Sequence, residues 1–76
     1  MRISKTFSGK QVIKALCKKF GFFEISQKGS HVKLRKEFAG KVVTTIVPMH
    51  RELARGTLKG ILELAEVDEK EFLQNI

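Results

Sequence analysis

The spacing of apolar residues predicts two main helices, one on each side of a segment with extended character. Residues 8–20 and 56–66 carry apolar positions every three or four residues, as in helices that bury one face. Ser8 can cap the first helix, and Gly21 can end it in a left-handed conformation. The positions predicted to be buried are Val12, Ile13, Leu16, Cys17 and Phe20 in the first helix and Leu58, Ile61, Leu62 and Ala65 in the second.

Three strands are predicted between the helices, in residues 22–28, 31–36 and 41–47. A Gly-Ser turn separates the first two strands, and a loop over residues 37–40 separates the last two. Pro48 should end the third strand, because proline has no amide proton for a strand ladder. After the second helix, Asp68 and Glu71 have the spacing of a capping box and predict a short final helix. At the start of the second helix, Thr57 is expected to be its cap.

This order predicts one α+β domain that spans residues 1–76. Consecutive strands with short connections favour an antiparallel sheet. Two helices with one apolar stripe each can cover one face of that sheet, which leaves the other face exposed to water. A chain of 76 residues has room for one modest core and no deep substrate cleft.

The segment around His31 is the richest in chemistry. Side chains alternate across an extended strand, so His31, Lys33 and Arg35 point to one face while Val32 and Leu34 point to the other. If the aliphatic pair lies under the helices, the imidazole and the two cations lie on the open face. An imidazole can accept or donate a proton near neutral pH, and the cations beside it suit an approaching phosphodiester.

The charge distribution also indicates a polyanionic partner on one side of the protein. The net charge is +7, with 15 Lys and Arg residues against 8 Asp and Glu residues. Residues 1–36 hold ten of the basic residues and one acid, whereas residues 37–76 hold five basic residues and seven acids. Charge alone is weak evidence, because basic residues also keep small proteins in solution.

Several classes of site and location are not indicated. Cys17 is the only cysteine, so no internal disulfide can form, and its place in the apolar stripe favours a core role over a nucleophilic one. His31 and His50 lie 19 positions apart and suggest no metal site, and no cofactor is expected. No apolar run is long enough to span a membrane, and no signal peptide is visible, so a cytoplasmic protein is expected.

The chain carries an ordered set of motifs, namely Ser8-Gly9-Lys10, Leu16, Phe20-Gly21-Phe22, Gln27-Lys28-Gly29-Ser30-His31-Val32-Lys33-Leu34, Val47-Pro48-Met49-His50 and Gly56-Thr57-Leu58. This set resembles the HicA family of messenger-RNA interferase toxins from toxin–antitoxin pairs. The resemblance implies a fold similar to the double-stranded-RNA-binding domain, RNA cleavage that requires no metal, and neutralisation by a HicB-type antitoxin. The histidine of the family's Gly-Ser-His element matches His31, which the resemblance makes catalytic.

The residues themselves allow that chemistry, because RNA carries its own nucleophile in the 2′-hydroxyl. His31 could act as general base or acid, and Lys33 is the first choice to stabilise the phosphate. His50 could take the second acid–base role, or it could shape the exit from the third strand through a bond to the backbone. The residues expected to contact RNA are Lys10, Lys28, Ser30, Lys33 and Arg35.

Lys10 begins a ridge with Lys14 and Lys18 at four-residue spacing. The ridge could follow a phosphate backbone, or it could be an ordinary solvated helix face. The function that the sequence favours is a ribonuclease toxin covered by an antitoxin with an acidic surface. The alternatives are a basic RNA-binding module without catalysis, and an adaptor whose basic face meets only an acidic protein.

Overall fold

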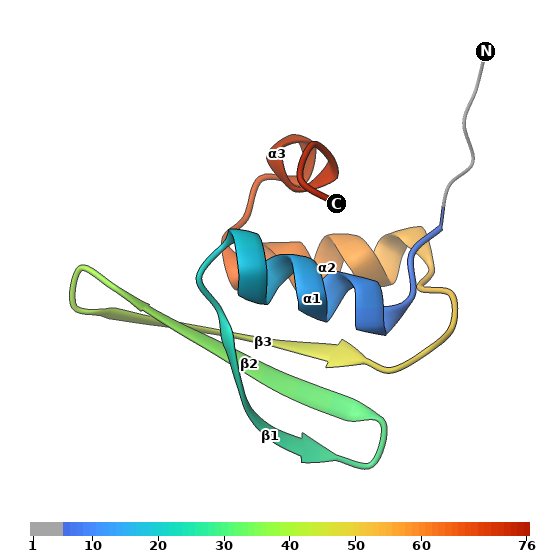
Figure 1. The fold of residues 1–76 in the computed structure, drawn as a ribbon, viewed down its shortest axis with the longest axis horizontal. Coiled ribbons are helices and arrows are strands. Elements are labelled where there is room, and N and C mark those ends of the chain that lie inside the picture. The colour runs from blue at the N-terminus through green and yellow to red at the C-terminus, as the bar shows by residue number, and fades with distance from the viewer. Residues whose placement is uncertain (1–5) are drawn as a thin grey trace.

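The computed structural model describes residues 6–76, and its elements follow the predicted order. The three strands form one antiparallel sheet in the order β1-β2-β3. Figure 1 shows α1 and α2 on one face of this sheet, with the β2–β3 hairpin extending beyond the helices. The elements are α1 (Gly9–Lys19), β1 (Phe23–Lys28), β2 (His31–Phe38), β3 (Lys41–Pro48), α2 (Arg55–Ala65) and α3 (Glu69–Leu73).

Helix α1 has the predicted cap at each end. The Ser8 side chain accepts a hydrogen bond from the Gln11 amide, and the Gln11 side chain accepts one from the Ser8 amide, which completes a capping box. At the other end, Gly21 has a φ of 81°, a left-handed conformation that glycine adopts without steric cost. The Phe22 amide then donates back to the Leu16 carbonyl, so the chain turns sharply into β1.

Helix α2 starts differently from the prediction. Its N-cap is Ala54, which offers no side-chain hydrogen bond, and Thr57 lies inside the helix, so the prediction of Thr57 as the cap is wrong. Its buried face is Leu58, Ile61, Leu62 and Ala65, as predicted. Helix α3 has Asp68 as its cap, and its Phe72 ring is fully buried and stacks on Phe20 with 5.9 Å between ring centroids. This stacking anchors the last helix to the end of α1.

The β2–β3 connection is shorter than the predicted loop over residues 37–40. Strand β2 continues to Phe38, and the turn consists of Ala39 and Gly40 alone, with φ values of 52° and 77°. Two positive φ values in a two-residue loop are typical of a type I′ turn, whose twist matches that of the flanking strands. The hairpin is therefore longer and more regular than the sequence pattern suggests.

The alternation along β2 and β3 divides the sheet into a core face and an open face. The core face carries Val32 and Leu34 from β2 and Val43, Thr45 and Val47 from β3, all of them buried. The one polar member, Thr45, donates its hydroxyl proton to the Ile61 carbonyl of α2 at 2.8 Å, so no hydrogen-bonding group is lost on burial. These five side chains form the core face of the sheet beneath the helices. The residues of β2 that alternate with Val32 and Leu34 lie on the open face.

Strand β1 is an exposed edge with an irregular register. Pairing with β2 shifts between Glu24 and Ser26, so Ile25 is the extra residue of a β-bulge. In a regular strand Phe23 and Ile25 would lie on one face, but the bulge breaks that regularity. Beyond it, Ser26 and Lys28 pair with Lys33 and His31 of β2, and their side chains share the open face with them.

A junction of three backbone segments connects the start of α1 to the end of the sheet that carries His31. Gly9 approaches Pro48 so closely that an added Cβ would lie 2.0 Å from the Pro48 carbonyl oxygen. The Gly9 amide donates to the His50 carbonyl at 2.9 Å, and the Met49 amide donates to the Ser30 carbonyl at 2.6 Å. Because every contact involves backbone atoms, the junction holds the β1–β2 turn, the end of β3 and the first turn of α1 together.

We therefore predict that Gly9→Ala lowers the free energy of unfolding by about 1–3 kcal/mol, because the new methyl group collides with backbone that cannot move aside. Gly60→Ala is the matched control. Gly60 lies inside α2 with no atom within 4 Å of an added Cβ, so alanine should stabilise the protein by about 0.5–1 kcal/mol. Urea unfolding followed by circular dichroism measures both. Equal midpoints for the two variants would contradict the role of the junction.

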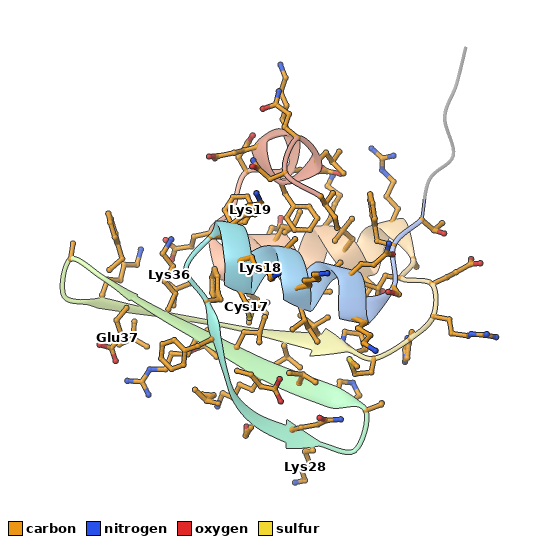
Figure 2. All side chains as sticks on the ribbon, viewed as in Figure 1. Cys17, Lys18, Lys19, Lys28, Lys36 and Glu37 are labelled. Atoms are coloured by element: carbon orange, nitrogen blue, oxygen red, sulfur yellow. The ribbon has the colours of Figure 1, made fainter. Side chains whose placement is uncertain are left out.

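Cys17 packs against the core from the side of α1 that faces the sheet (Figure 2). Burial, and next the negative charge of Glu24, raise the pKa of the Cys17 thiol above its usual value. The thiol therefore stays protonated at neutral pH, and the thiolate is the reactive form. We predict that iodoacetamide alkylates Cys17 several-fold more slowly at pH 8 in the folded protein than in the urea-unfolded chain. An equal or faster rate in the folded protein, measured by mass spectrometry, would show that this thiol is activated.

Candidate functional site

His31 is the first residue of β2 and follows the two-residue Gly29–Ser30 turn. Gly29 has a φ of 60°, which lets the chain reverse tightly between Lys28 and His31. The side chain of His31 is exposed, while that of the next residue, Val32, is buried. The predicted placement of the imidazole on the open face is therefore confirmed.

The imidazole lines a shallow hollow of about 440 Å³ on that face. Its lining consists of Ser26, Lys28, His31, Lys33 and Ile46. The strand register explains this set, because Lys28 pairs with His31, and Lys33 pairs with Ser26 on one side and Ile46 on the other. Three neighbouring strands thus contribute to one site, with Ile46 as an apolar wall.

Lys28 and Lys33 are the free cations of the site. No ion pair among residues 6–76 involves either of them. Figure 2 shows Lys28 at the edge of the sheet, directed away from the helices. Two ammonium groups beside an exposed imidazole create a local positive potential that attracts a phosphate.

The basic residues farther along β2 are already engaged. Arg35 forms an ion pair with Glu37 at 2.8 Å and does not line the hollow. Its Nε atom is buried and has no hydrogen-bond partner in the part of the chain that the structure describes. Lys36 points to the other face, where its ammonium group lies 5.7 Å from the centroid of the Phe22 ring and 5.5 Å from that of Phe38. Free positive charge on β2 is thus concentrated at the His31 end.

Other residues predicted to contact RNA lie outside the hollow. Ser30 is in the turn, and its backbone carbonyl is held by Met49. Lys10 projects from the first turn of α1 and is exposed. Both adjoin the junction at the His31 end of the sheet, but neither side chain lines the hollow.

His50 lies two residues beyond Pro48 and does not line the hollow either. Its side chain is exposed, and its backbone carbonyl accepts the hydrogen bond from Gly9. The backbone contact agrees with the structural alternative, in which this residue shapes the exit from β3. No described contact connects its imidazole to that of His31.

Ser26 and Ile46 complete the hollow and were missed by reasoning from the sequence. A two-residue turn at Gly29–Ser30 places Ser26 opposite Lys33, so that residue could have been found from the turn length. Ile46 could not have been found in this way, because the predicted four-residue loop places Thr44, and not Ile46, opposite Lys33. Only the omission of Ile46 reflects an error of register, and that error leaves the assignment of faces intact.

The arrangement can perform acid–base chemistry at a phosphate. An exposed imidazole can exchange a proton with bound substrate, and flexible ammonium groups can approach the non-bridging oxygens of a phosphodiester. In residues 6–76, no three His, Cys, Asp or Glu side chains form a group that could hold a metal ion. The same part of the chain contains no helix with the length and apolar character needed to cross a bilayer.

Comparison with known proteins agrees with this site. The sequence model of a family described as "HicA toxin of bacterial toxin-antitoxin" matches residues 9–67, which include both main helices, the whole sheet and the hollow. A search of curated proteins finds no match to the chain. The family match covers well over half of the 76 residues. The chain therefore belongs to the HicA toxin family of bacterial toxin–antitoxin systems.

Proposed function

We propose that this protein is a toxin that cleaves messenger RNA, with His31 as the general acid or base and with no requirement for a metal ion. The observation that carries the proposal is the hollow in which an exposed imidazole lies between two unpaired lysines. Membership of the HicA family supports messenger RNA as the substrate, because the family is one of RNases. Such a substrate also agrees with the expected cytoplasmic location.

In the proposed reaction, the 2′-hydroxyl of RNA loses its proton and attacks the adjacent phosphorus. The bond to the 5′-oxygen breaks, that oxygen gains a proton, and the products are a 2′,3′-cyclic phosphate and a 5′-hydroxyl. His31 accepts the first proton or supplies the second, which contributes about 10²–10⁴-fold. Lys33 is the first choice to stabilise the charge that develops on the phosphate oxygens, and Lys28 is placed to assist it.

The remaining predicted contacts have flanking roles. Arg35 can bind a phosphate beyond the hollow if its ion pair with the exposed Glu37 breaks. Breaking that pair costs little, since a surface ion pair contributes only about 0–1 kcal/mol to stability. Ser30 borders the site through the turn that places His31. We assign His50 no catalytic role, because it lies outside the hollow and its backbone is part of the junction.

An antitoxin partner follows from the family, and we propose that it covers the open face with an acidic surface. The cations of the hollow favour negatively charged groups opposite them. Exposed apolar side chains on or beside the same face would be buried in such a complex: Phe23 is 49% exposed, Val42 55% and Ile46 44%. An antitoxin bound to this face would block the access of RNA to His31.

We predict that His31→Ala lowers cleavage of a messenger-RNA fragment by at least about 10²-fold, because the general acid or base is lost. Affinity for RNA should change little, since the exposed lysines remain. The matched control is His50→Ala, which removes the other imidazole and should cleave like the wild type. Gel assays with chelator present measure cleavage, and fluorescence anisotropy measures binding.

Undiminished cleavage by His31→Ala would rule out the proposed role of this residue. If the wild type binds RNA with a steep salt dependence but never cleaves it, the protein is an RNA-binding module instead. If it shows no affinity for RNA even at low salt, an adaptor for an acidic protein is the remaining explanation.

A further inference from the structure

Helix α1 carries a ridge of lysines that the proposed active site does not use. Lys10, Lys14 and Lys18 recur every four residues, all three are exposed, and the helix contains no acidic residue. A rise of 1.5 Å per residue separates successive members of this lysine ridge by about 6 Å along the helix axis. Consecutive phosphates of an RNA strand have a comparable separation, so the ridge matches the charge spacing of an RNA backbone.

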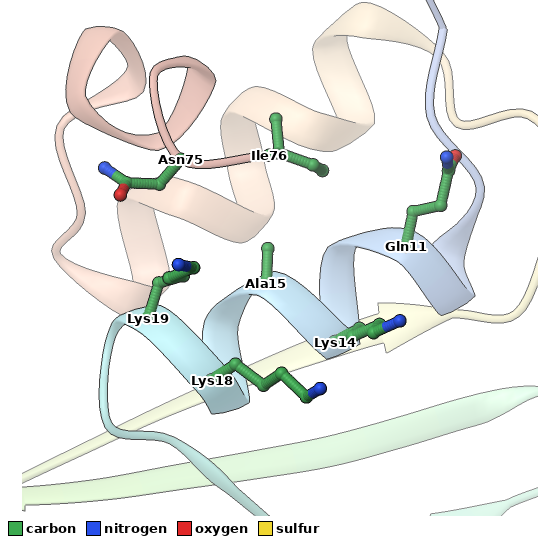
Figure 3. A pocket seen from close by; sticks show the side chains of 7 residues that line it. All are labelled: Gln11, Lys14, Ala15, Lys18, Lys19, Asn75 and Ile76. Carbon is green, nitrogen blue, oxygen red and sulfur yellow. The ribbon is translucent and has the colours of Figure 1, made fainter.

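The ridge also borders a groove of about 290 Å³ between α1 and the segment after α3 (Figure 3). Ala15 lies in the groove, and no acidic side chain lines it. The charged side chains of the lining all come from α1, whereas Asn75 and Ile76 on the other wall have uncharged side chains. The lining residues are Gln11, Lys14, Ala15, Lys18, Lys19, Asn75 and Ile76.

The charge of the ridge is not neutralised within the described protein. None of the ion pairs among residues 6–76 involves a lysine of α1. Like charges at four-residue spacing repel one another and weaken a helix. A bound polyanion would offset that repulsion. The row of lysines itself does not stabilise the helix.

The position of the ridge connects it to the candidate active site. Lys10 follows Gly9, which packs against Pro48, and Pro48 pairs directly with His31. The ridge therefore begins at the His31 end of the sheet and runs away from it along α1. The hollow and α1 lie on opposite faces of the sheet. An RNA strand that leaves the hollow and passes around this end of the sheet would meet Lys10 first, then Lys14 and Lys18.

We propose that the lysine ridge of α1 binds the backbone of RNA beyond the cleaved bond, as a second contact surface separate from the hollow. This inference rests on the proposed function, because it extends the same substrate. It gives the toxin higher affinity for RNA strands of several nucleotides than for short fragments. The alternative occupant, an acidic protein segment, lacks a reason for the regular spacing of the cations.

The test compares RNA binding by two charge-matched variants, both made in the His31→Ala background so that substrate stays intact. The ridge variant is Lys14→Gln with Lys18→Gln. The control is Lys59→Gln with Lys70→Gln, two exposed lysines outside the hollow and the groove. Glutamine keeps high helix propensity, and circular dichroism checks that both variants are folded. The probes are fluorescent single-stranded RNAs of about 4 and about 14 nucleotides. The shorter RNA should contact the hollow alone, and the longer RNA should contact both the hollow and the ridge.

For the longer RNA, the ridge variant should bind about tenfold more weakly than its parent, and the slope of log K against log salt should fall by about 1.4 for two lost phosphate contacts. The shorter RNA should bind equally to parent and ridge variant, and the control should change either affinity less than about twofold.

Equal losses in ridge variant and control, or a loss independent of RNA length, would overturn the proposal. So would a ridge variant that binds RNA normally but has lost affinity for an acidic partner protein. Cleavage by the otherwise wild-type protein is scored separately: its absence, with length-dependent binding intact, would refute the nuclease and leave the ridge as an RNA contact.

Discussion

The close approach of Gly9 to the Pro48 carbonyl is the constraint on which the arrangement of the site depends. No side chain fits between these backbones, so α1 can start where it does only from a glycine. The same junction holds the Ser30 carbonyl through Met49 and the His50 carbonyl through the Gly9 amide. The side chain of His31 is exposed, and its backbone pairs with Lys28 on one side and Pro48 on the other. Its position relative to α1 and β3 therefore comes from backbone contacts around the turn that precedes it.

A second consequence of the fold is the separation of packing from chemistry. On β2, Val32 and Leu34 are buried under the helices, whereas His31 and Lys33 are exposed on the open face. The open face can therefore carry unpaired cations with no desolvation cost, because nothing in the described protein covers them. It also leaves apolar side chains such as Phe23 exposed, which is unusual for a protein that works alone. The proposed function would use both features on one surface, because the protein would bind an RNA substrate and a protein inhibitor there in turn.

The sequence predicted the element order, the core face and the exposure of His31 because alternation depends only on the local period of apolar residues. Register depends on turn length, and there the prediction failed. Taking residues 37–40 as the loop shifts the β2–β3 pairing by two residues, which keeps each side chain on its face but exchanges Ile46 for Thr44 beside Lys33. The bulge at Ile25 and the engagement of Arg35 by Glu37 had no signal in apolar spacing. Gly9 was part of a recognised motif, yet only the structure shows the carbonyl that requires a glycine there.

In the proposed reaction, His31 moves a proton while RNA supplies the nucleophile. The most direct measurement uses a defined oligonucleotide with the ribose 5′ to the cleaved bond replaced by 2′-deoxyribose, compared with its all-ribose parent by mass spectrometry. We expect the parent to yield a fragment ending in a 2′,3′-cyclic phosphate and one beginning with a 5′-hydroxyl, whereas the substituted strand should stay intact at that bond. Cleavage of the substituted strand there, or fragments bearing 3′-hydroxyl and 5′-phosphate ends, would contradict it.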